Sequence, residues 1–270
     1  MFIGNKKCRI YAACGVSQTP IINKCIEEGM LFSVATARMP YGCDYRLKDI
    51  HMTIPGILTN GVFLYDFKNE KYVSVENIGA EVAKQVVKIF KDVKLSCFVY
   101  IFTQDKINVY YDTKSMEEQT QYYSDRALEK CGEVKMVSDL KQILNTGDIC
   151  YLAYTGHKEE LQPVCEKLDK LKGICYSFYL NIYNGMYCLE IFSDKANKKN
   201  ALIKLKKLLE CEEVVVFGDN FNDLPMIELA DRSYAPENAL PEIKEKVTEV
   251  LEDCDHDGVA KFLKNEFSEN

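Results

Sequence analysis

The sequence lacks the features that mark several common classes of protein. None of its apolar runs approaches the roughly 18 residues that a transmembrane helix needs, so we expect no membrane partner. It also lacks a basic excess, because 34 basic and 41 acidic residues leave a net charge of −7. A nucleic-acid partner is therefore not expected, since binding to a phosphate backbone requires a basic surface. A local site can still hold a small anion.

Cysteine and histidine follow no recognisable framework. Twelve cysteines are scattered along the chain, and no two have the Cys-x-x-Cys spacing. We therefore expect reduced thiols, many of them buried as small apolar residues, in a cytoplasmic protein. The three histidines, His51, His157 and His256, lack the spacing of metal ligands.

The short motifs of three large enzyme classes are also missing. The chain has no GxxxxGK[ST] loop, so it is not a P-loop NTPase, and it has neither a GxSxG nor a GxGxxG motif. A catalytic or binding site must therefore be sought in other patterns.

The order of the expected elements indicates two domains. In the outer parts of the chain, strands alternate with helices, which is typical of a doubly wound, mostly parallel α/β sheet. The elements expected there are helices at 17–28, 39–49, 239–252 and 257–264, and strands at 31–35, 57–59 and 214–217. From about residue 80 the segments are rich in Tyr and Phe. We expect two of them, residues 97–102 and 107–111, to form an antiparallel pair of strands. We predict a Rossmann-like core from 1–79 and 187–270, with an inserted α+β lid domain at 80–186.

The most informative stretch is the apolar strand 214–217 with the polar cluster that follows it. Asp219, Asn220, Asn222 and Asp223 come directly after this strand and before an apolar helix pattern. Open α/β sheets bind their ligands just past the carboxyl ends of strands. Two carboxylates there indicate a hard divalent metal such as Mg²⁺, with Asp219 as the best ligand and Asp223 next. The simpler interpretation, a polar loop that caps a helix, fits many Asp-rich turns but is less favoured for so dense a cluster.

Three further polar residues are candidates for anion binding. Thr36 ends a buried strand, where its hydroxyl can donate to a phosphate oxygen or, about equally often, cap a helix. Arg38 can steer an anionic substrate or lie on the surface. Lys198 opens the helix that follows residue 193, where an ammonium opposes the helix dipole unless an anion lies between them. Several other lysines lie close to Lys198 in the sequence, and most of them belong to a solvated helix face. The sequence alone therefore does not single out Lys198 as the phosphate ligand.

In order along the chain, these residues resemble the motifs of the haloacid dehalogenase superfamily, in its Cof-type branch of Mg²⁺-dependent phosphatases. The sequence 34–38 (VATAR) resembles the second motif, ATGR, with Ala37 in place of glycine, and 58–62 (LTNGV) resembles the segment after it. Glu190-Ile191 with 197–202 (NKKNAL) resembles the third motif, and 218–223 (GDNFND) matches the fourth, metal-binding motif. The similarity runs from about residue 16 to 264 and includes a middle insertion like the C2-type cap of this branch.

The resemblance implies a phosphatase of small phosphorylated metabolites, with sugar phosphates as the leading class and Mg²⁺ as the cofactor. It implies phosphate binding by Thr36, Ala37, Lys198 and Asn222. It further implies substrate contacts from Arg38 and Asn60, and metal ligands at Asp219 and Asp223. The cap would supply the specificity contacts. Whether the protein is a monomer or a homodimer is left open.

The first motif of the family, Asp-x-Asp-Gly-Thr, is not found in this chain. Residues 1–15 contain no carboxylate, and the first aspartate, Asp44, follows the second motif and lies on the wrong element to substitute. The family nucleophile is therefore not identifiable, and Cys14, close to the vacant position, is a poor replacement without a cationic neighbour. We expect impaired or absent turnover, because no aspartyl-phosphate can form without the nucleophile.

Two alternatives stay open at this point. The chain is either a phosphatase whose N-terminal residues differ from the native ones, or a degenerate relative that binds a phosphorylated ligand without cleaving it. An in-frame Asp-x-Asp-Gly-Thr in the gene upstream would support the first alternative.

Overall fold

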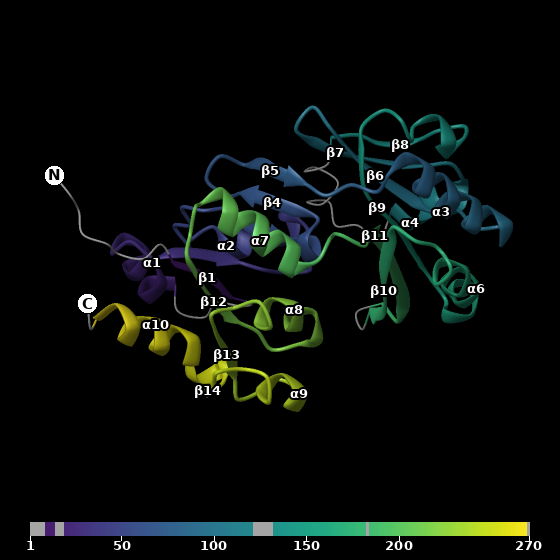
Figure 1. Ribbon diagram of the computed structural model, residues 1–270. Coiled ribbons are helices and arrows are strands. Elements are labelled where there is room, and N and C mark those ends of the chain that lie inside the picture. The colour runs from purple at the N-terminus through teal and green to yellow at the C-terminus, as the bar shows by residue number, and fades with distance from the viewer. Residues whose placement is uncertain (1–8, 14–18, 121–131, 182–183, 269–270) are drawn as a thin grey trace. The chain divides into compact units, whose positions relative to one another are not determined.

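The computed structural model describes residues 9–13, 19–120, 132–181 and 184–268. It divides into a first unit, Met1–Ser74 with Asn197–Asn270, and a second unit, Val75–Ala196 (Figure 1). Both ends of the chain thus contribute to the first unit. The observed boundaries differ from the predicted ones at 79/80 and 186/187. The second of these would have separated β11 (Met186–Ser193) from β10 (Ile174–Asn181), with which it forms a continuous antiparallel pair.

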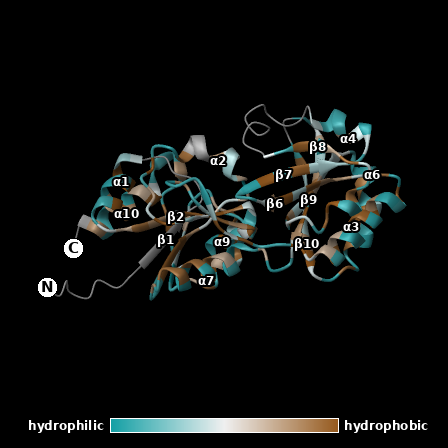
Figure 2. Ribbon diagram, turned by 90° about the horizontal axis from the view of Figure 1, so that it is seen from above, coloured by the Kyte–Doolittle hydropathy of each residue, from teal (hydrophilic) through white to brown (hydrophobic). Residues whose placement is uncertain are grey.

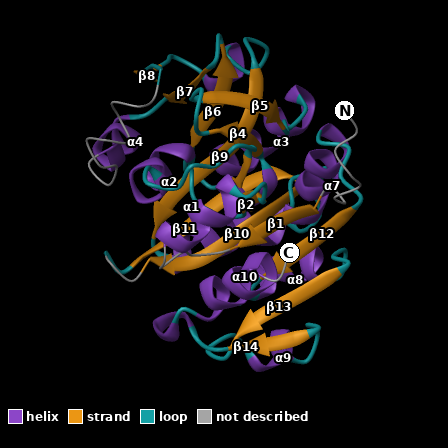
Figure 3. Ribbon diagram, turned by 90° about the vertical axis from the view of Figure 1, so that its left-hand side faces the viewer, coloured by secondary structure: helices purple, strands orange, loops and turns teal. Residues whose placement is uncertain are grey.

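The first unit contains a five-stranded parallel sheet with the order β14-β13-β12-β1-β2 (Figure 3). Its strands are β1 (Arg9–Ala13), β2 (Leu31–Val34), β12 (Glu213–Phe217), β13 (Arg232–Pro236) and β14 (Glu249–Leu251). Each neighbouring pair in this sheet is parallel. The carboxyl ends of all five strands therefore lie at one edge, as the α/β prediction requires.

Helices cover both faces of this sheet because the central strand is apolar on both sides. Val214 and Val216 belong to a buried cluster with apolar residues of α7, α8 and α9. Phe217 lies on the other face, where its ring makes an edge contact with Phe262 of α10. The helices of this unit are α1 (Thr19–Glu27), α2 (Pro40–Leu47), α7 (Lys198–Leu208), α8 (Leu224–Ile227), α9 (Pro241–Lys244) and α10 (Gly258–Ser268). Figure 2 shows apolar colouring along strands and alternating bands on the helices, which is the expected pattern for amphipathic helices on a buried sheet.

A small antiparallel sheet adjoins the second strand. It consists of β3 (Gly56–Leu58), β4 (Phe63–Asp66) and β5 (Lys71–Val75), and Ala35 forms a parallel bridge to Ile57. Its β3 to β4 turn contains the Asn60-Gly61 pair that predicted a hairpin, with φ of 52° and 101° at the two residues. Asn and Gly are the residues that tolerate such left-handed backbone.

The second unit is a six-stranded sheet with the order β10-β11-β9-β6-β7-β8. Besides β10 and β11 it contains β6 (Phe98–Thr103), β7 (Lys106–Tyr111), β8 (Val134–Met136) and β9 (Asp148–Gly156), with helices α3 (Ala80–Asp92), α4 (Lys114–Gln119) and α6 (Lys158–Leu168). All pairs are antiparallel except β7 with β8. The antiparallel pair predicted from the Tyr- and Phe-rich segments is confirmed as β6 and β7.

One sequence-based expectation needs correction. The helix expected at 239–252 is instead the single turn of α9 followed by β14, because Val250 and Leu251 pair with Ala235 and Pro236 of β13. The five-stranded parallel sheet belongs to the first unit, and the strand pairs of the second unit are antiparallel except β7 with β8. None of the described helices combines the length and the apolar character needed to cross a bilayer.

Most of the described cysteines are free thiols, as expected, but one is not. The free ones are Cys25, Cys43, Cys97, Cys150, Cys165, Cys175, Cys188 and Cys254. Burial strongly raises the pKa of the Cys97 and Cys150 thiols, so they are inert apolar residues. Cys211, however, is disulfide-bonded. The expectation of reduced thiols does not hold at that position.

Candidate functional site

The predicted site residues of the first unit come from loops at one edge of its parallel sheet. Thr36 follows β2, and Asp219 to Asp223 follows β12, while β1 lies between these two strands. Because the strands are parallel, both loops emerge at their carboxyl ends. The fold thus places residues far apart in the sequence along one edge.

The loop after β12 curls around the side chain of Asp223. Its Oδ2 atom accepts hydrogen bonds from the backbone N–H groups of Asp219 (3.1 Å) and Asn220 (3.2 Å). A Cβ atom at Gly218 would lie 2.6 Å from the Cβ of Asp223, so only glycine allows this close return of the chain. The Asn220 side chain caps the short 3₁₀ turn Phe221–Asp223. The segment GDNFND therefore folds into a compact turn that is held by hydrogen bonds between its own residues.

The other oxygen of Asp223 holds Lys198. Nζ of Lys198 lies 2.6 Å from Oδ1 of Asp223, and the two side chains are only 2% and 1% exposed. Lys198 is the first residue of α7, whose N-cap is Asn197 with its Oδ1 accepting from the Asn200 N–H. A buried ammonium at a helix N-terminus is costly and is stabilised here by the carboxylate. The structure thereby selects Lys198 from its neighbouring lysines.

Thr36 and Asn60 extend the site toward β2. Asn222 donates from Nδ2 to Oδ1 of Asn60 (3.3 Å), and the Asn60 N–H donates to the Thr36 carbonyl (3.0 Å). The Thr36 hydroxyl oxygen accepts from the Arg38 N–H at 3.2 Å, which leaves its proton available to a ligand. Thr36 is partly buried, whereas Ala37 and Arg38 are exposed.

One glycine joins the two halves of the site. A Cβ atom at Gly61, whose φ is 101°, would lie 2.4 Å from the carbonyl oxygen of Asn197. The turn that carries Asn60 therefore packs directly on the N-terminus of α7. In this way Thr36 and Asn60 on one side, and Lys198 and the β12 loop with Asn222 on the other, form one continuous site.

Asp219 presents its carboxylate at the exposed edge of this locus. Partial burial raises the pKa of its carboxyl above the usual range, the negative charge of Asp223 raises it further, and the Lys198 ammonium opposes both. The side chain therefore lies within electrostatic range of the buried pair. It is a hard oxygen ligand that protonates at a higher pH than an ordinary aspartate.

A cavity of about 300 Å³ adjoins Asp219 within the first unit. Its apolar side is formed by Phe32 and Phe217, and its polar side includes Cys254 and Asp255. The sequence pattern did not indicate Cys254 or Asp255 as neighbours of Asp219, because their proximity depends on the turn between β14 and α10. They line a space that a ligand of Asp219 could enter.

The carboxylates of this site can hold Mg²⁺ only if water and a substrate phosphate complete its coordination. No group of three or more His, Cys, Asp or Glu arranged for a metal occurs among the described residues. Asp219 offers an exposed carboxylate, whereas both oxygens of Asp223 already accept hydrogen bonds. Mg²⁺ is commonly held by one or two carboxylates, water and substrate phosphate, so these residues fit that mode.

The position of the missing nucleophile lies just after β1. The strand itself, 9–13, contains no carboxylate, and neither do Cys14 and Gly15 after it. Cys14 lies outside the described residues. Glu190 of the third-motif resemblance belongs to β11, in the second unit, and is not part of the described locus.

Comparisons with known proteins agree on one family. A model of the haloacid dehalogenase-like hydrolases matches residues 16–263. A curated relative is the 5-amino-6-(5-phospho-D-ribitylamino)uracil phosphatase YwtE of Bacillus subtilis, 26% identical over 263 residues, which cover 90% of this chain and 88% of the relative.

Solved structures agree in fold. The structure of TM0651 from Thermotoga maritima has a TM-score of 0.71 and 22% identity, covering 96% of this chain and 97% of its own. The subclass IIB sugar phosphatase BT4131 has a TM-score of 0.66 and 14% identity, covering 96% and 98%. At these identities the likeness concerns the fold alone.

Proposed function

Since the chain belongs to the haloacid dehalogenase-like hydrolase family, we propose that its first unit binds the phosphoryl group of a small phosphorylated metabolite, as a Cof-type phosphatase does. Sugar phosphates are the leading substrate class. A subclass IIB sugar phosphatase shares the fold, and YwtE, with its phospho-ribityl substrate, is similar over most of the chain.

The observation that carries this proposal is the buried Lys198–Asp223 pair beside the exposed carboxylate of Asp219. A salt bridge of this kind does not by itself stabilise a fold, since an apolar pair of the same volume is often at least as good. Its location at a helix N-terminus and at the carboxyl edge of the sheet is instead what an anion site requires. Function explains its presence better than stability does.

Each residue has a distinct role in the proposed site. Lys198 neutralises phosphoryl oxygens, and Asp223 holds its ammonium in place rather than binding the metal directly. The Thr36 hydroxyl and the Ala37 N–H donate hydrogen bonds to the phosphoryl group, while Asn222 and Asn60 position that loop. Asp219 would hold a Mg²⁺ ion, which supplies charge stabilisation for the phosphoryl oxygens. Arg38, exposed beside Thr36, steers the anionic substrate, and the second unit serves as the cap.

The chain as it stands lacks the group that would attack the phosphorus atom. With no carboxylate at the end of β1, covalent transfer to an aspartate has no acceptor, and we expect binding without efficient turnover. This gives a second candidate function, a phospho-ligand-binding or regulatory protein derived from the family. The single observation that favours it is the absence of any aspartate before Asp44.

Binding and turnover are tested separately. Inorganic phosphate and a panel of sugar phosphates should raise the melting temperature when Mg²⁺ is present, and Asp219→Asn and Thr36→Val should reduce the shift. Asp92→Asn, an exposed aspartate of the second unit, serves as the matched control. No shift with any ligand would contradict the proposal.

Turnover is tested by restoring the motif. The double substitution Cys14→Asp and Val16→Asp reintroduces the Asp-x-Asp spacing directly after β1. The original chain should hydrolyse para-nitrophenyl phosphate slowly or not at all, and the restored chain should gain Mg²⁺-dependent activity. Substantial hydrolysis by the original chain that Asp219→Ala abolishes would contradict the expected loss of turnover.

A further inference from the structure

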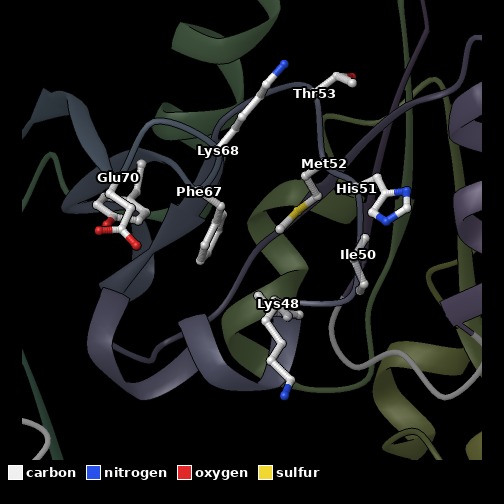
Figure 4. Close-up of a pocket in the computed structure, with 10 residues that line it drawn as sticks. Lys48, Ile50, His51, Met52, Thr53, Phe67, Lys68 and Glu70 are labelled. Carbon is white, nitrogen blue, oxygen red and sulfur yellow. The ribbon is translucent and has the colours of Figure 1, made fainter.

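A second cavity of the first unit lies away from the phosphoryl locus. Its volume is about 510 Å³, within the range of small-molecule sites, and the end of α2, the segment after it and the β4–β5 hairpin enclose it (Figure 4). It is lined by Leu47, Lys48, Ile50, His51, Met52, Thr53, Tyr65, Phe67, Lys68 and Glu70. The lining includes none of the residues assigned to phosphoryl or metal binding.

The floor of this cavity is apolar and partly aromatic. Ile50 and Met52 are 7% and 5% exposed, and Phe67 stands opposite Met52 in Figure 4. Tyr65 and Phe67 meet edge to face with ring centroids 5.2 Å apart. A Cβ atom at Gly56 would lie 2.7 Å from the Phe67 ring, so this ring is packed on the backbone beneath it. Such a floor suits a flat apolar body.

Side-chain hydrogen bonds hold both walls. On the hairpin, the Asp66 carboxylate accepts from the N–H groups of Lys68 (2.9 Å) and Asn69 (3.1 Å) and from the Asn69 side chain. On the opposite wall, Asn23 of α1 donates to the Asp49 carbonyl at 2.8 Å and accepts from the His51 N–H at 2.9 Å. One wall of the cavity is therefore held by a local turn and the other by a tertiary contact with α1.

The rim carries more positive than negative charge. Lys48 and Lys68 extend from opposite ends of the cavity, with Glu70 as the lining carboxylate (Figure 4). The nearby Asp66 does not line the cavity; its carboxylate accepts the hydrogen bonds of its turn and keeps its negative charge beside Lys68. Thr53 and His51 add hydrogen-bonding groups at the rim. Among the lining residues, two flexible lysines against one carboxylate give a small positive excess at the ends of an apolar floor, which favours an anion over a cation.

We propose that this cavity is a binding site for an organic anion with a flat apolar body, such as an aromatic carboxylate, separate from the phosphoryl site. The body packs against Ile50, Met52 and Phe67, and the acid group is held by Lys48 or Lys68. The proposal does not depend on whether the chain hydrolyses phosphate esters.

The test uses 2-naphthoate as the probe, with calorimetric titration of the full chain. We expect one molar equivalent to bind, and the cationic analogue 2-naphthylmethylammonium to bind about tenfold more weakly or worse. The double variant Lys48→Glu, Lys68→Glu should lose about tenfold or more in affinity. Lys264→Glu, an exposed lysine on α10, is the matched control and should bind as the unchanged chain does.

Two further measurements keep this site apart from the phosphoryl site. Asp219→Asn should leave naphthoate binding unchanged, and saturating inorganic phosphate with Mg²⁺ should not displace the probe. Displacement by phosphate, equal affinity for the cationic analogue, or unchanged binding in the double lysine variant would each overturn the proposal.

Discussion

Each unit contains a buried aspartate paired with a lysine, but only in the first unit is the lysine buried as well. In the second unit, Nζ of Lys91 lies 2.9 Å from Oδ2 of Asp112, with the lysine side chain 38% exposed and the aspartate 4%. In the first unit the corresponding values for Lys198 and Asp223 are 2% and 1%.

The difference shows what each pair does. Lys91 also meets Asp139, and Asp112 accepts from the Ser96 hydroxyl and the Leu140 N–H, so this network joins α3 to β7 and to the turn at Leu140–Gln142. This network stabilises the packing of the second unit, and the Lys91 ammonium stays partly hydrated. The Lys198 ammonium is fully desolvated at a helix N-terminus, where the dipole opposes it. A fold gains little from such an arrangement, whereas an anion site uses it.

The largest expected effect follows from removing one partner of the buried pair. Lys198→Ala leaves the Asp223 carboxylate buried without its cation and should lower the free energy of unfolding by about 3–5 kcal/mol. Lys91→Ala should cost less, about 1–2 kcal/mol, because water reaches that site. Urea denaturation measures both. Equal losses of unfolding free energy in the two variants would contradict the inferred difference between the two lysine–aspartate pairs.

The next effect concerns the glycine that joins the two halves of the site. Gly61→Ala places a Cβ atom at left-handed φ and against the Asn197 carbonyl, and it should destabilise the first unit by about 2–3 kcal/mol. Gly185→Ala, in the second unit at φ 70° with no atom near its Cβ, is the matched control and should cost about 1 kcal/mol. Thermal unfolding followed by circular dichroism ranks the two, and a larger loss at Gly185 would contradict the close packing of α7 on this turn.

The second unit has its own titrating carboxyl, and its effect depends on pH. Burial raises the pKa of Glu190 to about 7, against the opposing effect of its hydrogen bond with Tyr179. The folded state then retains a proton that the unfolded state releases, so stability is full below about pH 4 and is lost as the pH rises toward 7. Glu190→Gln should remove this loss, a gain of about 3 kcal/mol over the original chain at pH 8 relative to pH 4.

The measurement is urea denaturation at several pH values. Glu118→Gln, an exposed glutamate of the same unit, should keep the pH dependence of the original chain. A Glu190→Gln variant with the same profile as the original chain would show that this carboxyl titrates normally.

The smallest expected effect is on ligand binding in the first unit. The raised pKa of Asp219 means that its carboxyl gains a proton at a higher pH than an ordinary aspartate. Because the protonated form cannot hold Mg²⁺, the melting-temperature shift from Mg²⁺ with phosphate should fall as the pH decreases from 7.5 toward 5. We expect a loss of a few degrees at most, and Asp219→Asn should show little shift at any pH in this range. A shift that grows on acidification would contradict the assigned role.

The sequence by itself determined the chemical content of the site and much of the local structure. GDNFND after a β-branched run marks a strand, a tight turn and a carboxylate cluster, and Asn60-Gly61 marks a hairpin, because these conformations depend on a few neighbouring residues. The switch to aromatic, alternating strands near residue 80 similarly marked the antiparallel second unit. The sequence did not predict short strands such as Val250-Leu251 correctly. Whether such a segment forms a strand depends on its pairing with β13 rather than on its own periodicity.

Only the tertiary structure decided which polar residues act together. It distinguished Lys198 from its neighbouring lysines by burial against Asp223, and it separated the role of Asp223 from that of Asp219 by engaging both oxygens of Asp223. It also brought Asn222 to Asn60 and created the cavity between the α2 end and the β4–β5 hairpin. Burial and long-range contact arise from how strands align and helices pack, and those interactions join residues that no local sequence pattern connects.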